Sequence, residues 1–285
     1  MITLGTAPDS WGVWFAADPA QIPYPRFLDE VAESGYRAIE LGPYGYLPTQ
    51  PDRLARELSA RGLTLTAGTV FEHLHRHDEW DDIAPVAELA ATAGAADLVV
   101  IPGLWRHPID GTALDAPELS AAQWRTKLDR LAELSHKLSA QFGLRLQYHP
   151  HADSHVAGPA QVARVLADTG VSLCLDTGHI AYCGGDVETL LASHADRIGY
   201  LHLKQIDPDV VAKAAADDIP FGEAVRMDCF VEPPTGVPSF DPVFAALAHR
   251  DIVAIVEQDM YPCAPERPLP IARRTRNYLR GCGIG

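Results

Sequence analysis

The chain has 285 residues, 47% of them hydrophobic and 21% charged, and its formal net charge is −15 at pH 7. A surface this acidic repels phosphate backbones, so we expect no nucleic-acid partner. No apolar run approaches the roughly 20 residues of a membrane helix. The first residues also lack a basic stretch followed by an apolar one, so we expect a cytoplasmic protein with no membrane contact.

Short apolar runs alternate with amphipathic stretches along the chain. The expected strands are residues 2–6, 37–41, 64–70, 98–101, 144–148, 172–175, 198–203 and 252–256. The expected helices are residues 24–34, 51–61, 82–93, 121–142, 159–168, 187–194, 241–249 and 269–280, several of them ending at a glycine. Eight such periods predict an α/β protein of one domain over residues 1–285, a (β/α)₈ TIM barrel. A doubly wound sheet is the alternative, but no GxGxxG follows the first strand.

Polar side chains gather at the carboxyl ends of the last four expected strands. Residues 147–151 read Gln-Tyr-His-Pro-His, and the next three strands end near Asp176, His202 and Glu257. A strand–helix–strand crossover is right-handed and brings parallel strands out on the same side, so Asp176 and His202 are expected side by side. Lys204 lies two residues after His202 and points the same way. It is expected either to bind a ketone oxygen or to pair with a carboxylate.

Each of these residues also has an ordinary explanation. An Asp after a strand often caps a helix, and a single His on a strand is often a core residue. Three of them at consecutive strand ends favour a ligand set. Oxygen and nitrogen donors together suit Mn²⁺, Co²⁺ or Mg²⁺ better than a structural Zn²⁺ site.

Four motifs resemble a known family. They are APDSWGVW at 7–14, CLDTGH at 174–179, HLK at 202–204 and IVEQD at 255–259, and together they resemble the xylose-isomerase-like barrel superfamily. YHPHADSHV at 148–156 and FGEAV at 221–225 resemble the inosose dehydratases within it. The resemblance implies that Asp176, His202 and Glu257 bind a divalent metal, with Mn²⁺ or Co²⁺ expected first, Mg²⁺ or Zn²⁺ as alternatives, and no nucleotide cofactor. It puts the fourth ligand at Gln147, where relatives commonly have Glu.

Gln147 decides between the reactions that this resemblance implies. Related epimerases use two carboxylates on opposite sides of the sugar, and an amide takes up no proton at neutral pH. We therefore expect a lyase that dehydrates a keto-cyclitol such as myo-inosose, for which one base and one acid are enough. His149, His151, Glu257 and Lys204 are the candidate catalytic groups. A keto-sugar isomerase or epimerase is the alternative, and a non-catalytic sugar-binding barrel is the second.

Further residues are expected to contact a small polyol or keto-sugar. They are Trp11, Trp14, Glu40, His73, His179, Glu223 and Arg226. The two tryptophans would form an apolar wall against a sugar ring, although core packing explains them equally well. Glu223 and Arg226 belong to a long loop at 207–239, which follows the seventh strand and is expected to cover the site. The oligomeric state stays open, with a homodimer or a homotetramer as the alternatives.

Overall fold

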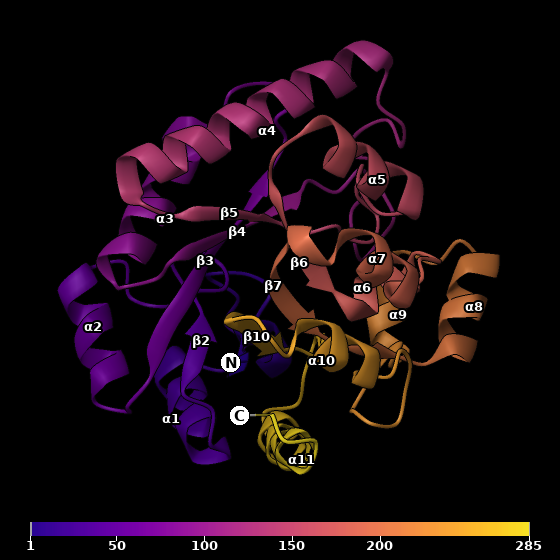
Figure 1. Ribbon diagram of the computed structural model, residues 1–285. Helices are drawn as coiled ribbons and strands as arrows, with labels where there is room; N and C mark the ends of the chain where they lie inside the picture. The colour runs from indigo at the N-terminus through magenta and orange to yellow at the C-terminus, as the bar shows by residue number, and fades with distance from the viewer. Residues whose placement is uncertain (1, 285) are drawn as a thin grey trace.

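Eight parallel strands close into a barrel in a computed structural model that describes residues 2–284 (Figure 1). They are β1 (Ile2–Thr6), β2 (Ala38–Glu40), β3 (Thr64–Glu72), β4 (Asp97–Pro102), β5 (Arg145–Tyr148), β6 (Ser172–Asp176), β7 (Ile198–Leu203) and β10 (Ile252–Val256). They follow one another around the barrel in chain order, and β10 pairs back to β1. The predicted (β/α)₈ fold is confirmed.

Helices surround the strands on the outside. They are α1 (Tyr24–Ser34), α2 (Pro51–Ser59), α3 (Trp80–Thr92), α4 (Ala121–Phe142), α5 (Pro159–Asp168), α7 (Val187–His194), α10 (Asp241–Leu247) and α11 (Pro268–Gly281). Each matches an expected helix: four have the predicted ends, and the ends of the other four differ by one or two residues. The longest, α4, begins at a capping box between Ser120 and Gln123 and ends at Gly143, whose φ of 69° fits the left-handed stop.

Two apolar layers lie on the two faces of the strands. The larger layer fills the space between strands and helices and includes Leu146, Leu201 and Leu203. The smaller layer plugs the inside of the barrel and includes Val99, Cys174, Tyr200 and Ile255. Because side chains alternate along a strand, the residue two positions after an inner apolar one points inward as well. His202 and Glu257 therefore stand directly above the plug.

A buried ion pair fixes α4 to the barrel. Lys127 contacts the carboxylate of Glu72, and both side chains are fully buried. The hydroxyl of Tyr148 donates to Glu72 Oε1 at 2.8 Å, and the Leu74 N–H donates to Glu72 Oε2 at 2.7 Å. The charge of Glu72 is thus compensated by a cation and two hydrogen bonds, as a buried carboxylate requires.

The segment after β7 is folded, which corrects the expectation of a long loop at 207–239. It contains β8 (Gln205–Ile206), α8 (Pro208–Ala216), α9 (Phe221–Arg226) and β9 (Phe230–Val231), and β8 pairs antiparallel with β9. Asp207 caps α8 by accepting from the Asp209 and Val210 amides. The segment has an apolar core of its own, and its helices lie together on one side of the barrel in Figure 1.

Across residues 2–284, every helix of the protein is too short or too polar to cross a membrane.

Candidate functional site

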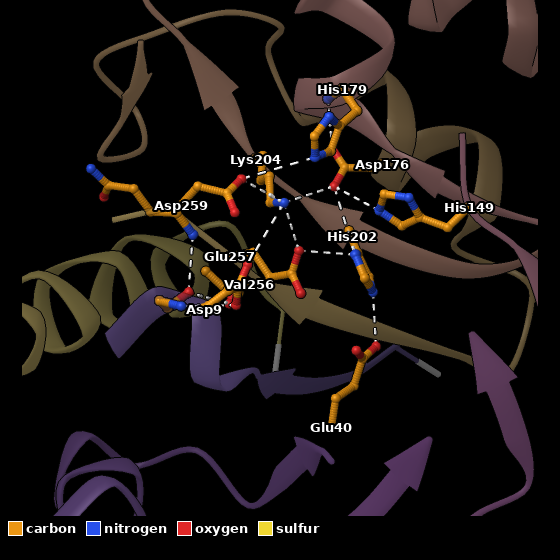
Figure 2. A network of polar contacts seen from close by, with 12 residues as sticks. Asp9, Glu40, His149, Asp176, His179, His202, Lys204, Val256, Glu257 and Asp259 are labelled. Atoms are coloured by element: carbon orange, nitrogen blue, oxygen red, sulfur yellow. Dashed lines mark hydrogen bonds and ion pairs between the residues drawn. The ribbon is translucent and has the colours of Figure 1, made fainter. Parts of the chain in front are cut away.

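Polar side chains from four neighbouring strands meet at the carboxyl end of the barrel (Figure 2). Asp176 is the last residue of β6 and lies opposite His202 of β7 in the strand register, as predicted. Glu257 directly follows β10, and His149 directly follows β5. All four side chains are at least 95% buried. Asp176 also caps the short helix α6 (Thr177–Tyr182), since its Oδ1 accepts from the His179 amide at 2.7 Å.

Adjacent members of this group are spaced like neighbouring ligands of a metal ion. Oδ2 of Asp176 lies 3.3 Å from Nε2 of His149 and 3.6 Å from Nδ1 of His202. Nδ1 of His202 lies 2.9 Å from Oε2 of Glu257. Neighbouring ligands of an ion with bonds of about 2.1 Å are about 3.0 to 3.4 Å apart in octahedral or tetrahedral geometry. The donors present therefore fit a divalent cation in both chemistry and spacing.

Glu40, at the end of β2, orients the His202 ring from the other side. Nε2 of His202 donates to Glu40 Oε1 at 2.8 Å, which turns Nδ1 toward Asp176 and Glu257. A carboxylate behind a histidine is the usual support for a metal-binding imidazole. Burial lowers the pKa of His202, but the groups around it, Cys174, Glu257 and Glu40, raise that pKa well above its usual value. Metal binding would therefore have to release a proton from this ring.

Lys204 lies at the centre of the carboxylates. Its Nζ is 2.9 Å from Glu257 Oε2, 2.9 Å from Asp259 Oδ2, 3.2 Å from Asp176 Oδ2 and 3.7 Å from Asp9 Oδ2. Burial disfavours its charge, but the carboxylates outweigh burial and hold the pKa of Lys204 well above its usual value. The lysine is therefore a fixed positive charge among these carboxylates.

Two neutral imidazoles complete the polar end. The ring centroids of His151 and His179 are 4.0 Å apart, and burial, followed by a neighbouring histidine and Lys204, lowers both pKa values, that of His151 to about 3. Nδ1 of His151 faces the Ala152 carbonyl at 2.7 Å, so this nitrogen is the donor and Nε2 keeps its lone pair. Nδ1 of His179 accepts from the Ala152 amide at 3.3 Å, so its proton sits on Nε2, which is buried without a hydrogen-bond partner. A buried polar atom without a partner suggests a place for a ligand group.

These groups line one side of a cavity of about 620 Å³. Nine of the residues expected at the site line it: Trp14, Glu40, His73, His149, His151, His179, His202, Lys204 and Glu257. Trp14 stacks on Phe221 of α9, with centroids 5.9 Å apart. The segment after β7 therefore reaches the cavity through an aromatic side chain.

The structure places Gln147 away from this centre, which corrects its expected role as fourth ligand. Its Nε2 donates to Asp97 Oδ1 at 2.7 Å, at the start of β4, and it is paired in register with Ser172, the first residue of β6. A Cβ on Gly199, near the start of β7, would lie 2.4 Å from the Gln147 amide oxygen. The side chain points into the barrel as expected, but Gln147 lies two residues before the layer of the metal-binding candidates. His149 occupies the position that had been assigned to Gln147.

Three other expected contacts are not made. Trp11 is buried in the core, where its Nε1 donates to Glu30 Oε2 at 2.8 Å and its ring packs edge-on against Phe27. Glu223 and Arg226 pair with each other on the outer side of α9, and both are about 40% exposed. Their amphipathic helix presents Phe221 to the cavity instead.

Asp9 and Asp259 are the residues that the sequence analysis missed. Both line the cavity, and both face Lys204. Asp259 stands two positions after Glu257, a spacing that signals the same side of an extended chain. Asp9 follows β1 in the first of the family motifs, in which Trp11 and Trp14 had been expected to contact the substrate.

Known proteins resemble this chain over most of its length. A model of the family described as xylose isomerase-like TIM barrel matches residues 28–282. The rhizopine catabolism protein MocC of Rhizobium meliloti is 32% identical over 83% of this chain and 75% of its own. The inosose dehydratase of Erwinia tasmaniensis is 30% identical over 90% of this chain and 89% of its own.

A solved structure agrees with the fold. The IolI protein, crystallised with a bound zinc atom, superimposes with a TM-score of 0.67 over 97% of both chains, at 18% sequence identity. At that identity the likeness concerns the fold alone. The family model, in contrast, covers nearly the whole chain, and the two relatives match by sequence at 30% identity or more. This chain belongs to the xylose isomerase-like TIM barrel family.

Proposed function

We propose that this protein is a metal-dependent lyase that removes water from a keto-cyclitol, with myo-inosose as the first candidate substrate. The observation that carries the proposal is that the fifth strand supplies the imidazole of His149 to the ligand layer and no second carboxylate base of the kind that epimerases use. Asp176 and Glu257 are then the two carboxylates of the ligand set, both within 3.2 Å of Lys204. The sequence similarity to inosose dehydratase supports the same reaction.

The residues of the chain divide the reaction between them. A divalent ion held by His149, Asp176, His202 and Glu257 would polarise the ketone oxygen of the substrate. Nε2 of His151 has a free lone pair and takes the proton from the carbon next to the ketone. The carbon–oxygen bond on the next carbon breaks as the double bond forms, and Lys204 protonates the leaving hydroxyl, which departs as water. The proton on His151 then returns to Lys204 through solvent.

Hydrogen bonds to the substrate hydroxyls come from the remaining polar groups. His179 offers its Nε2–H, and Asp9 and Asp259 offer carboxylate oxygens on the far side of Lys204. Trp14 and Phe221 cover the polar end and limit the access of water. The partner expected from this arrangement is a small neutral polyol that carries a ketone.

The test is incubation with myo-inosose after removal of metal by a chelator and reconstitution with Mn²⁺ or Co²⁺. Dehydration creates a conjugated chromophore, so ultraviolet absorbance should rise only in the reconstituted samples. An epimer recovered without absorbance, detected by proton NMR in D₂O, would establish the isomerase alternative. Binding without any change in the sugar would establish the non-catalytic alternative.

A further inference from the structure

Large exposed hydrophobic side chains are concentrated around the cavity. Among residues 2–284, five such side chains are exposed, and four of them line the cavity: Phe15, Tyr44, Phe71 and Leu114, each 41 to 51% exposed. The fifth, Val237, does not line it. Exposed apolar side chains gathered beside a cavity are typical of a binding surface.

The four side chains, here called the apolar rim, occupy one half of the barrel mouth. They stand at or after the carboxyl ends of β1, β2, β3 and β4, which are adjacent in the barrel. The side chains around Lys204 come mainly from the other half, β5, β6, β7 and β10. The cavity therefore has a polar half that suits a hydroxylated ring and a second half in which the large exposed side chains are apolar, although Glu79 and Asp82 also line that half.

The cavity is larger than a cyclitol ring. A keto-cyclitol has twelve non-hydrogen atoms, and even at the ~30 Å³ that one water molecule occupies in the liquid, twelve atoms fill about 360 Å³. This value is an upper bound because bonded atoms pack more tightly than separate molecules. The 620 Å³ of the cavity thus leaves more than about 260 Å³, and the apolar rim borders that remainder.

The two halves are in contact at the reacting groups. The Phe71 ring is 6.2 Å from the His151 ring, centroid to centroid, in an edge-on arrangement. On the other side, Phe15 packs edge-on against Tyr261, which stacks on Trp14. A group attached to the substrate ring could lie along these aromatic surfaces.

We propose that the physiological substrate is a keto-cyclitol or keto-sugar that carries an alkyl or aryl substituent, such as an ether or a glycoside. The inference rests on the proposed function, in that the polar half is taken to hold the ketone-bearing ring. The substituent lies against the apolar rim, where it removes exposed apolar surface from water on binding. The rim thus selects among substrates, while the polar half carries the reaction.

The experiment compares myo-inosose with its O-benzyl ether on the metal-loaded protein. Dissociation constants come from calorimetry and kcat/KM from product absorbance, for the native protein and for Phe71→Ser, Leu114→Ser and the control Val237→Ser. We expect the ether to bind at least ~10-fold more tightly than the parent, since one methylene in an apolar pocket already changes selectivity by about that factor. The two rim variants should lose this preference while they keep their affinity for the parent, and Val237→Ser should behave as native.

Each outcome is decisive. Equal or weaker binding of the ether overturns the inference, and so does a parallel loss for both ligands in the rim variants. If Phe71→Ser or Leu114→Ser converts an oligomer into monomers in sedimentation, the rim is a contact between copies of this chain and the inference is wrong. If the ether binds more tightly but neither compound loses water, the proposed function fails and the assignment of the rim stands.

Discussion

Lys204 and a metal ion compete for the same oxygens. Nζ of Lys204 lies within 3.2 Å of Asp176 and Glu257, the two carboxylates that fit the ion. A divalent cation there would repel the ammonium group, which has Asp259 at 2.9 Å and Asp9 at 3.7 Å as its remaining partners. The ammonium group therefore balances the charge of these carboxylates, and binding of a divalent ion would displace it toward Asp259.

Replacement of this lysine should strengthen metal binding and abolish turnover. In Lys204→Met the repulsion is removed, and one interaction of unit charges at an effective dielectric constant near 20 corresponds to several kcal/mol. We expect metal affinity, measured by calorimetry with Mn²⁺, to rise at least ~10-fold while the absorbance assay shows no product. Lys204→Arg keeps the charge and serves as control for affinity. Weaker metal binding in Lys204→Met would mean that the lysine supports the ion rather than opposing it.

Substitution of His149 should weaken metal binding and substitution of Gln147 should not, which is the opposite of what the sequence suggested. His149→Ala removes an imidazole 3.3 Å from Asp176, so we expect metal affinity to fall ~10- to 100-fold. Gln147→Ala lies below the centre and should leave metal content unchanged. Because it removes one hydrogen bond to Asp97, which keeps its two hydrogen bonds from Arg145, it should lower the free energy of unfolding by about 0.5–1.5 kcal/mol. Metal analysis and urea unfolding of both variants test the pair, and metal loss in Gln147→Ala would restore the original assignment.

At the scale of elements, the barrel strands and outer helices could be predicted because their signals are local. A short apolar run, or a helical stripe ended by glycine, is visible in the sequence by itself. Alternation also identified His202, Lys204 and Glu257 as neighbours. The depth of Gln147 could not be predicted, because the height of a side chain in a barrel depends on the stagger of the closed sheet.

The structure of the segment after β7 was harder to predict from the sequence, for another reason. Its helices are short, and its Asp, Pro and Gly residues suggest turns, although Asp207 followed by Pro208 is also a helix start. Which face of α9 meets the cavity depends on how the segment packs. Charged residues drew attention to Glu223 and Arg226, whereas tertiary packing turned Phe221 inward.

The buried ion pair between Lys127 of α4 and Glu72 of β3 should contribute much of the stability with which α4 packs on the barrel. Lys127→Ala leaves the Glu72 carboxylate buried without its cation, and we expect a loss of about 3–5 kcal/mol in the free energy of unfolding. Lys137→Ala is the control on the same helix, since its partners Asp78 and Glu133 are both 60% exposed, and it should cost less than about 0.5 kcal/mol. Equal small losses in urea unfolding would show that solvent reaches Glu72.

At the scale of the whole molecule, charge restricts the substrate. The net charge is −15, and four carboxylates line the cavity near Lys204 and His202, those of Asp9, Glu40, Glu257 and Asp259, while Asp176 lies beside them, 3.2 Å from Lys204. Glu79 and Asp82 also line the cavity, so acidic groups outnumber the positive charges there even with a divalent ion bound. A neutral polyol experiences little of this field, whereas an anionic substrate is repelled at the surface and again in the cavity.

Phosphorylated keto-sugars should therefore be poor ligands. We expect a phosphate ester to show kcat/KM at least ~10-fold below that of the unphosphorylated compound at low salt. The difference should shrink as sodium chloride rises from about 50 to about 500 mM, because salt screens the repulsion. The unphosphorylated compound should respond less than about twofold over that range. A phosphate ester that is the better substrate at low salt would contradict this account of the cavity.

Closure of the barrel also dictates when the molecule can finish folding. β1 pairs with β10, and the Thr6 hydroxyl donates to the Val256 carbonyl across 250 residues of sequence. A ribosome adds about 5–20 residues per second, so roughly 12 to 50 s pass before the partner of β1 exists. Throughout that interval the nascent sheet has an open edge, which is prone to pair with other chains. Glu257 joins His202 only at the end of synthesis, so the proposed ligand set is incomplete until then.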